Sequence, residues 1–146
     1  MRMQILLDPD DALRRELAAL GICDDESSDY ILMKRSMSVN YIPAKKDERL
    51  FYIAVADIVY FESLGHEIFV HTANETFVTR ERLKQMEKLL DSEKFLRVSA
   101  SAIVNTAQIK QIEASIFQKF ILHMTNGARI DVTRSYYYMF KARFHL

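Results

Sequence analysis

The sequence predicts a mainly β protein of the α+β class: an antiparallel β domain with two helices, preceded by a small strand–helix–strand segment. Short runs rich in Ile, Val, Phe, Tyr and Thr recur between residues 58 and 132, which is typical of strands. Asn126-Gly127, a dipeptide that favours two-residue hairpin turns, separates two of these runs. After residue 58 only two stretches, near residues 83–90 and 136–144, have the apolar spacing of a helix.

The composition fits a folded globular chain. Hydrophobic residues make up 49% of the 146 residues and charged residues 27%, which argues against disorder. The longest apolar run is far shorter than the roughly 20 residues of a membrane helix, and no secretory signal is visible, so we expect a cytoplasmic protein. Cys23 is the only cysteine, which excludes an intrachain disulfide and a thiolate metal cluster.

The charges are unevenly distributed along the chain. The formal net charge is zero, whereas domains that bind nucleic acids are usually basic. Residues 1–37 hold five Lys or Arg against eight Asp or Glu, and the remainder holds fifteen against twelve. This asymmetry predicts an acidic appendage on a mildly basic domain.

Residues 1–40 are predicted to form the appendage, with a role in dimerisation or partner docking. We expect strands at 4–7 and 30–33 and a helix from Pro9 to Leu20, with Asp8 as its N-cap and Gly21 as its end. Lys45 to Glu48 is interpreted as a charged linker, which places a boundary near residues 36–48. The principal domain is therefore predicted to span residues 41–146.

Several elements are expected in the principal domain. An amphipathic helix over Leu83–Leu90 has Thr79 as its predicted N-cap, and Leu83, Met86, Leu89 and Leu90 share its apolar face. The last helix carries Tyr136, Tyr137, Phe140 and Phe144 on its buried side, with Tyr138 and Lys141 on the exposed side. The expected strands are 58–62, 67–72, 76–78, 96–98, 109–113, 117–124 and 129–132.

Catalytic and metal chemistry find no support in the sequence. His66 and His71 lie five residues apart along a loop and a strand, and no second cluster completes a metal-ligand set. Ser99 and Ser101 lack the glycine pattern of a nucleophile elbow, and three glycines provide no phosphate-cradling loop. We therefore expect no enzyme activity, no metal and no cofactor.

The segment from Phe95 to Asn105, FLRVSASAIVN, carries a family resemblance together with several separated motifs. A strand ending in DIVYFES precedes it, and the Asn-Gly hairpin and the segment VTRSY follow it. In this order the motifs resemble the LytTR family of bacterial DNA-binding domains over about ninety residues, from Asp57 to Phe144. The resemblance implies a transcription regulator that inserts loops of a β-rich fold into successive major grooves on one face of a bent duplex.

The resemblance also implies which residues bind DNA. By position these are His66, the Ser99-Ala100-Ser101 loop and Arg134, with Lys141, Arg80 and Lys110 as further phosphate contacts. Arg134 can pair bidentately with guanine, while His and Ser can donate to bases or phosphates. Asn105 is expected to have a structural role through its side-chain amide.

Two departures from the family pattern matter for function. Relatives usually carry His and Arg or Asn where this chain has Ser99 and Ala100; the Ala100 methyl can only touch a thymine methyl. Many relatives also carry a phosphoacceptor receiver, so this chain resembles a stand-alone regulator. The expected partners are double-stranded DNA, a second copy on repeated sites, and a regulatory protein such as a membrane inhibitor. An alternative, favoured by Ala100 and the zero net charge, is a β-rich protein-interaction module that has lost DNA readout.

Overall fold

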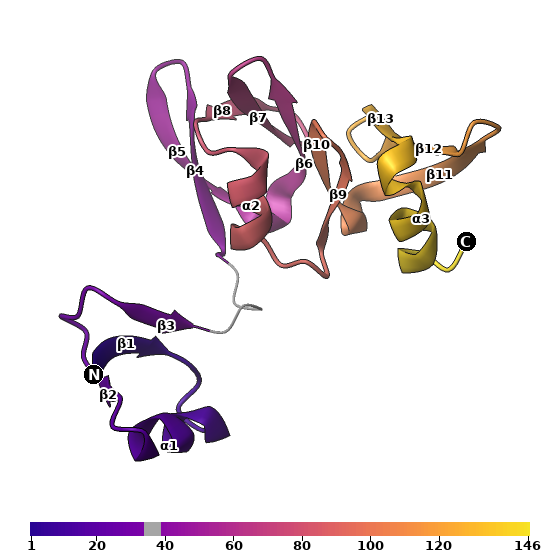
Figure 1. The fold of residues 1–146 in the computed structure, drawn as a ribbon. Helices are drawn as coiled ribbons and strands as arrows, with labels where there is room; N and C mark the ends of the chain where they lie inside the picture. The colour runs from indigo at the N-terminus through magenta and orange to yellow at the C-terminus, as the bar shows by residue number, and fades with distance from the viewer. Residues whose placement is uncertain (34–38) are drawn as a thin grey trace. The chain divides into compact units, whose positions relative to one another are not determined.

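The computed structural model describes residues 1–33 and 39–146 and divides the chain into two compact units, Met1–Met37 and Ser38–Leu146 (Figure 1). The predicted boundary region near residues 36–48 falls partly on residues 34–38, which lie outside the described residues. No helix in the described ranges is long and apolar enough to cross a membrane.

The N-terminal unit is a three-stranded parallel sheet with a helix on one face. Its strand order is β2-β1-β3, and Ile5, Leu7 and Leu17 form its small buried core. The elements are β1 (Arg2–Leu6), α1 (Ala12–Ala19), β2 (Cys23–Asp24) and β3 (Ile31–Met33).

Helix α1 begins later than the sequence predicted. Its N-cap is Asp11, whose side chain accepts from the N–H of Leu13 at 3.0 Å, so the prediction of Asp8 is wrong. The Asp11 N–H instead donates to the carbonyl of Asp8, which forms a turn before the helix. The end is as predicted, because Gly21 follows the last turn with a φ of 80°.

Asp24 links the strands of this unit to its helix. Its Oδ1 accepts from the Ile5 N–H at 2.9 Å, and its Oδ2 lies 3.2 Å from the Arg14 guanidinium. These two contacts hold the pKa of Asp24 below its ordinary value. A lowered folded-state pKa means that the ionised Asp24 stabilises the unit at neutral pH, and that this contribution is lost as the pH falls through the folded pKa.

We therefore expect Asp24→Asn to destabilise the N-terminal unit at pH 7 and to have little further effect at pH 3. Hydrogen exchange of residues 1–33, measured at both pH values, checks this expectation. Equal protection of wild type and variant at pH 7 would contradict it.

The larger unit contains two antiparallel sheets (Figure 1). The seven-stranded sheet has the order β5-β4-β8-β7-β6-β10-β9, and the second sheet has the order β11-β12-β13. The first contains β4 (Tyr41–Lys46), β5 (Arg49–Ala54), β6 (Ile58–Leu64), β7 (Glu67–Thr72), β8 (Thr76–Thr79), β9 (Phe95–Ser99) and β10 (Ala102–Asn105). The second contains β11 (Ile109–Ser115), β12 (Lys119–Met124) and β13 (Arg129–Val132), and the 3-10 turns Val55–Asp57 and Thr106–Gln108 precede β6 and β11.

One helix covers each sheet, which confirms the predicted mainly β fold with two helices in this domain. Helix α2 (Leu83–Leu89) packs Leu83 and Met86 onto the seven-stranded sheet, and Leu90 follows them into the same core. Two details of α2 differ from prediction: Leu89 is exposed, and Thr79 belongs to β8 while Arg82 is the N-cap.

Helix α3 (Arg134–Arg143) covers the second sheet. Phe140 is fully buried, with its ring 5.2 Å from Phe120 and 4.5 Å from Phe144. Tyr136 and Tyr137 pack against the same core, and Tyr138 is exposed, as the sequence predicted.

The charged run Lys45 to Glu48 is the tip of a hairpin, so its interpretation as a linker is wrong. Lys46 pairs with Arg49, and Asp47 and Glu48 between them have φ values of 52° and 63°. Positive φ at both central residues is the geometry of a type I′ turn, whose twist matches that of the strands it joins.

Candidate nucleic-acid interface

The pairing of the strands brings the predicted loops to one end of the larger unit. Leu64 pairs with Glu67, and Ile68 with Thr79, so the turn at Gly65-His66 lies at the same end of the sheet as Arg80. The Ser63 N–H donates to the Ser101 carbonyl at 2.8 Å, which ties the β9–β10 turn to the end of β6.

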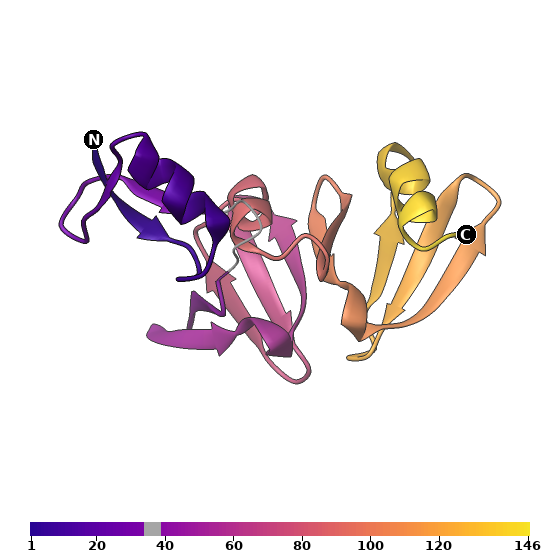
Figure 2. The ribbon, with the colours of Figure 1, turned by 90° about the horizontal axis from the view of Figure 1, so that it is seen from below.

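The start of α3 reaches the same end through another backbone contact. The Thr133 N–H donates to the Val98 carbonyl at 3.0 Å, directly before the β9–β10 turn and Arg134. We call this end of the unit the turn edge; it comprises residues 64–67, 80–84, 99–101 and 133–135. In Figure 2 the β9–β10 turn, α2 and α3 lie along this edge.

A basic depression of about 560 Å³ opens on the turn edge. Three of the predicted DNA-binding residues, His66, Arg80 and Ala100, line it together. Arg82, Lys84 and Arg97 line it as well, with Glu81 as its acidic residue. Lys84 is exposed on α2, and the direction in which it faces depends on how α2 packs onto the sheet.

Arg97 shapes the β9–β10 turn. Its Nε donates to the Ser99 carbonyl and its Nη2 to the Ala100 carbonyl, both at 2.7 Å, while its Nη1 pairs with Glu87 at 2.8 Å. The planar guanidinium thus holds two successive carbonyl groups and anchors them to α2. Arg97 therefore fixes the turn, a role that its position within FLRVSASAIVN did not reveal.

The two serines of the turn have different environments. Ser99 is buried, and its Oγ accepts from the Ser101 N–H at 3.1 Å and lies 3.2 Å from the Ser101 Oγ. Ala100 and Ser101 are exposed. The hydroxyl of Ser99 is thus used within the turn, whereas the Ala100 methyl and the Ser101 side chain face solvent.

Arg134 is the first residue of α3, and its exposed side chain makes no hydrogen bond or ion pair with any described residue. A cation at a helix N-terminus is unfavourable, because the positive end of the helix dipole repels it. The folded domain therefore gains no stability from this charge, which leaves the guanidinium available for a ligand.

Lys141 lies seven residues after Arg134, on the same side of α3. Its Nζ sits 5.8 Å from the centre of the Tyr137 ring. Lys110, in contrast, lies at the start of β11, close to the pairing of Ile109 with Met124. That pairing is at the opposite end of the second sheet, so the structure does not bring Lys110 together with the other predicted residues.

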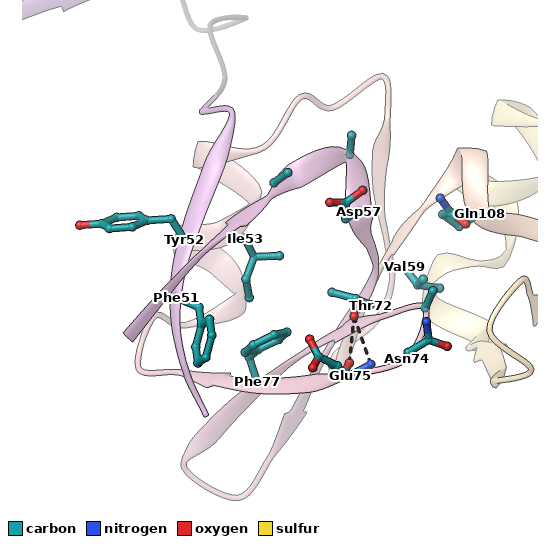
Figure 3. Close-up of a pocket in the computed structure, with 13 residues that line it drawn as sticks. Phe51, Tyr52, Ile53, Asp57, Val59, Thr72, Asn74, Glu75, Phe77 and Gln108 are labelled. Carbon is teal, nitrogen blue, oxygen red and sulfur yellow. Dashed lines mark hydrogen bonds between the residues drawn. The ribbon is translucent and has the colours of Figure 1, made fainter. Parts of the chain in front are cut away.

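The opposite end of the larger unit carries a second cavity, also of about 560 Å³ (Figure 3). Its apolar wall includes Phe51 and Phe77, whose rings are 5.4 Å apart. Asp57 and Glu75 also line this cavity, and its described lining contains no Lys or Arg. The lining of this cavity is thus acidic, although Lys46 pairs with Glu75 at 3.3 Å beside it, whereas the lining of the depression on the turn edge is mainly basic.

Two of the histidines have structural contacts. His71 lies 3.2 Å from Glu62 and stacks on Tyr60 with ring centres 4.2 Å apart, and His123 lies 3.0 Å from Glu113. Burial, and then the Glu62 charge, raise the pKa of Tyr60. Among the described residues, no three His, Cys, Asp or Glu side chains come together as a metal site would require.

Asn105 has the structural role that the sequence predicted. It is buried, its Nδ2 donates to the Ile58 carbonyl at 2.8 Å, and its Oδ1 accepts from the Ala107 N–H at 3.1 Å. It thereby fixes the ends of β6 and β10 that lie farthest from the turn edge.

Comparisons with known proteins agree with this architecture. The family model described as the LytTr DNA-binding domain matches residues 48–145. The transcriptional regulatory protein LytR of Staphylococcus aureus (strain bovine RF122 / ET3-1) is 30% identical over 122 residues, which are 82% of this chain and 49% of that protein. The sensory transduction protein LytT of Bacillus anthracis is 32% identical over 90 residues, 62% of this chain and 37% of that protein.

A solved structure is also similar. The LytTr DNA-binding domain of a Bacillus cereus protein superposes with a TM-score of 0.72 at 26% sequence identity, covering 75% of this chain and 100% of that domain. The chain spans about half the length, or less, of the curated relatives described above. By the extent of the family match, the chain belongs to the LytTR DNA-binding domain family.

Proposed function

We propose that this chain is a sequence-specific transcriptional regulator that grips bent double-stranded DNA with its turn edge, in successive major grooves. The observation that carries the proposal is the group of cations on the turn edge, Arg80, Arg82, Lys84 and Arg134, which outnumber its acidic residues Glu67 and Glu81 despite a net charge of zero. Phosphate binding depends on the cations that face the duplex, so a basic edge is enough for DNA binding even when the net charge of the chain is zero. Membership of a DNA-binding family supports the same function, which would be exercised in the cytoplasm.

Each residue of the turn edge has a proposed role. Arg134 reads guanine, and His66 donates to a base or a phosphate. Ser101 holds a phosphate oxygen and the Ala100 methyl contacts thymine, while Ser99 and Arg97 keep the turn in shape. Arg80 and Lys141 neutralise phosphates. Lys110 is left out of the proposed interface because it lies at the opposite end of the second sheet.

A salt series with matched variants tests this assignment. We expect Arg80→Ala to weaken binding to all fragments alike and to reduce the salt slope by about one unit, because one phosphate contact is lost. The remote Lys110→Ala variant should keep the wild-type slope. If Lys110→Ala reduced the salt slope and Arg80→Ala kept the wild-type slope, the duplex would lie at the other end of the domain.

The N-terminal unit is proposed to join two copies of the chain. Parallel sheets are normally covered on both faces, whereas α1 covers only one face of this sheet. Pairing of Leu6 with Met33 and of Gln4 with Ile31 places three exposed apolar side chains on the bare face. Arg2, on the same face, is paired with Asp25, so no unpaired charge opposes face-to-face contact there.

A second copy also suits the proposed DNA-binding mode. One turn edge offers few phosphate contacts, and two linked copies on repeated sites bind more tightly without any new contact type. A regulatory protein could control the chain by competing for the same face.

We expect Ile31→Lys to abolish self-association, because it would bury an unpaired charge at the contact. Sedimentation equilibrium should show the wild-type mass rising with concentration above 17.1 kDa, and the variant remaining at that mass. Leu20→Lys, a charge introduced at an exposed position at the end of α1, is the matched control. A wild type that stays monomeric at every concentration would contradict the proposed dimer.

A further inference from the structure

The tip of the β11–β12 hairpin presents two adjacent apolar side chains to solvent. Ile116 is 90% exposed and Phe117 is 66% exposed, and Ile116 is the most exposed of the large hydrophobic residues described. Exposed apolar residues are common singly, whereas two neighbouring ones at a projecting tip suggest a contact surface.

The tip is held in a defined conformation. Ser115 pairs with Lys119, which leaves a three-residue turn of Ile116, Phe117 and Gln118. Gln118 has a φ of 55°, a value at which such turns favour glycine. The hydrogen bond of the Gln118 side chain explains why glutamine occupies this position: its Nε2 donates to the Tyr138 hydroxyl at 3.1 Å. The hydrogen bond fastens the tip to the exposed face of α3.

That face of α3 belongs to the proposed DNA interface. Tyr138 lies one helical turn after Arg134, and Lys141 follows on the same side, so the tip continues a stripe that begins at Arg134. The register of the sheet also places the tip near the start of α3, because Phe120 pairs with Val132, which lies two residues before Arg134. Figure 2 shows the tip of this hairpin along the same edge as α3 and the β9–β10 turn.

The charge around the tip points to a nucleic acid as its partner. The nearest acidic residue on the hairpin, Glu113, lies two residues before Ser115 and is 3.0 Å from His123. Arg134 and Lys141 lie on the face of α3 to which Gln118 is hydrogen-bonded. Lys119 directly follows the tip and is exposed. An apolar tip bordered by Lys119 and bonded to a basic helix face suits a duplex, which offers apolar sugar and base surfaces between rows of phosphates.

We propose that Ile116 and Phe117 form an apolar finger that packs against the sugars and bases of the groove beside the one entered by Arg134. Lys119 neutralises a phosphate at the border of that groove. The finger extends the DNA-binding surface of the domain beyond the turn edge, and it adds affinity that does not depend on charge. This inference rests on the proposed function.

The test uses the full chain and a DNA fragment selected from a random-sequence pool by the wild-type protein. Affinity is measured over a salt series for wild type and Phe117→Ser. The matched control is Tyr52→Ser, which removes an aromatic ring that is 72% exposed on β5. Both rings are solvent-exposed, and Ser is favoured in turns such as the one that holds Phe117, so both variants should fold.

Phe117→Ser is expected to lower the affinity roughly tenfold at every salt concentration, because apolar area is lost and no phosphate contact changes. Tyr52→Ser should bind as wild type does. Wild-type affinity in Phe117→Ser would overturn the finger alone and would leave the tip to a different partner. A wild type that selects no fragment from the pool would overturn the proposed function and the finger together.

Discussion

Replacing Phe140 by alanine is expected to destabilise the larger unit by about 3–5 kcal/mol, the usual cost of removing a buried aromatic ring. Phe140 is fully buried and contacts both Phe120 and Phe144, so the cavity would open where α3 meets the second sheet. Urea unfolding followed by the near-ultraviolet dichroism of the aromatic cluster measures this loss.

The neighbouring Met139 provides the control for this experiment. Its side chain is exposed on α3, so Met139→Ala should change the stability by only about 0.5 kcal/mol. Because α3 positions Arg134, we also expect Phe140→Ala to weaken DNA binding near its unfolding midpoint. Equal unfolding midpoints for the two variants would show that α3 does not depend on this core.

Replacing Arg134 by alanine is expected to weaken DNA binding by about 1–3 kcal/mol and to relax the preference at one base position. The physical reason is the loss of a bidentate pair with guanine, which alanine cannot replace. The fold should not suffer, since Arg134 is exposed at the positive end of the α3 dipole. Competition binding with fragments that differ at single positions measures both effects.

Arg134→Lys separates the charge of this residue from its geometry. Lysine keeps the positive charge but lacks the planar fork of donors, so the salt slope should stay and the base preference should fall. If Arg134→Lys kept the full preference, Arg134 would be a phosphate contact and base readout would lie elsewhere on the turn edge.

Local patterns in the sequence sufficed for most elements of the larger unit. Alternating apolar residues predicted most strands from Ile58 onward, although β10 was missed and the strand expected at 117–124 begins only at Lys119. The Asn126-Gly127 turn and the apolar stripe of α3 were recognisable because both depend on neighbouring residues. The family resemblance, confirmed by the match over residues 48–145, ordered these elements into one domain.

The errors occurred where one pattern suits two structures. Lys45 to Glu48 has the composition of a linker, and only the pairing of β4 with β5 makes it a turn. Asp8 and Asp11 are both acceptable caps, and the turn between them decides in favour of Asp11. Leu89 follows the apolar spacing of α2 but lies beyond the edge of the sheet core.

The candidate site required long-range pairing that sequence spacing does not encode. Whether Lys110 lies beside Arg134 or far from it depends on the direction of β11, and the grip of Arg97 on the β9–β10 turn depends on α2. The net charge was uninformative for the same reason, because it does not reveal that the cations of residues 80–84 and Arg97 gather around one depression.

Hydrogen exchange of the full chain, with and without a DNA fragment selected by the protein, tests the central claim most directly. DNA is expected to slow exchange at the turn edge, in residues 64–67, 80–84, 99–101 and 133–135. Exchange around Thr72 to Glu75, at the acidic cavity, should stay unchanged. Protection at the acidic cavity, or no protection on the turn edge, would contradict the claim that this edge grips DNA.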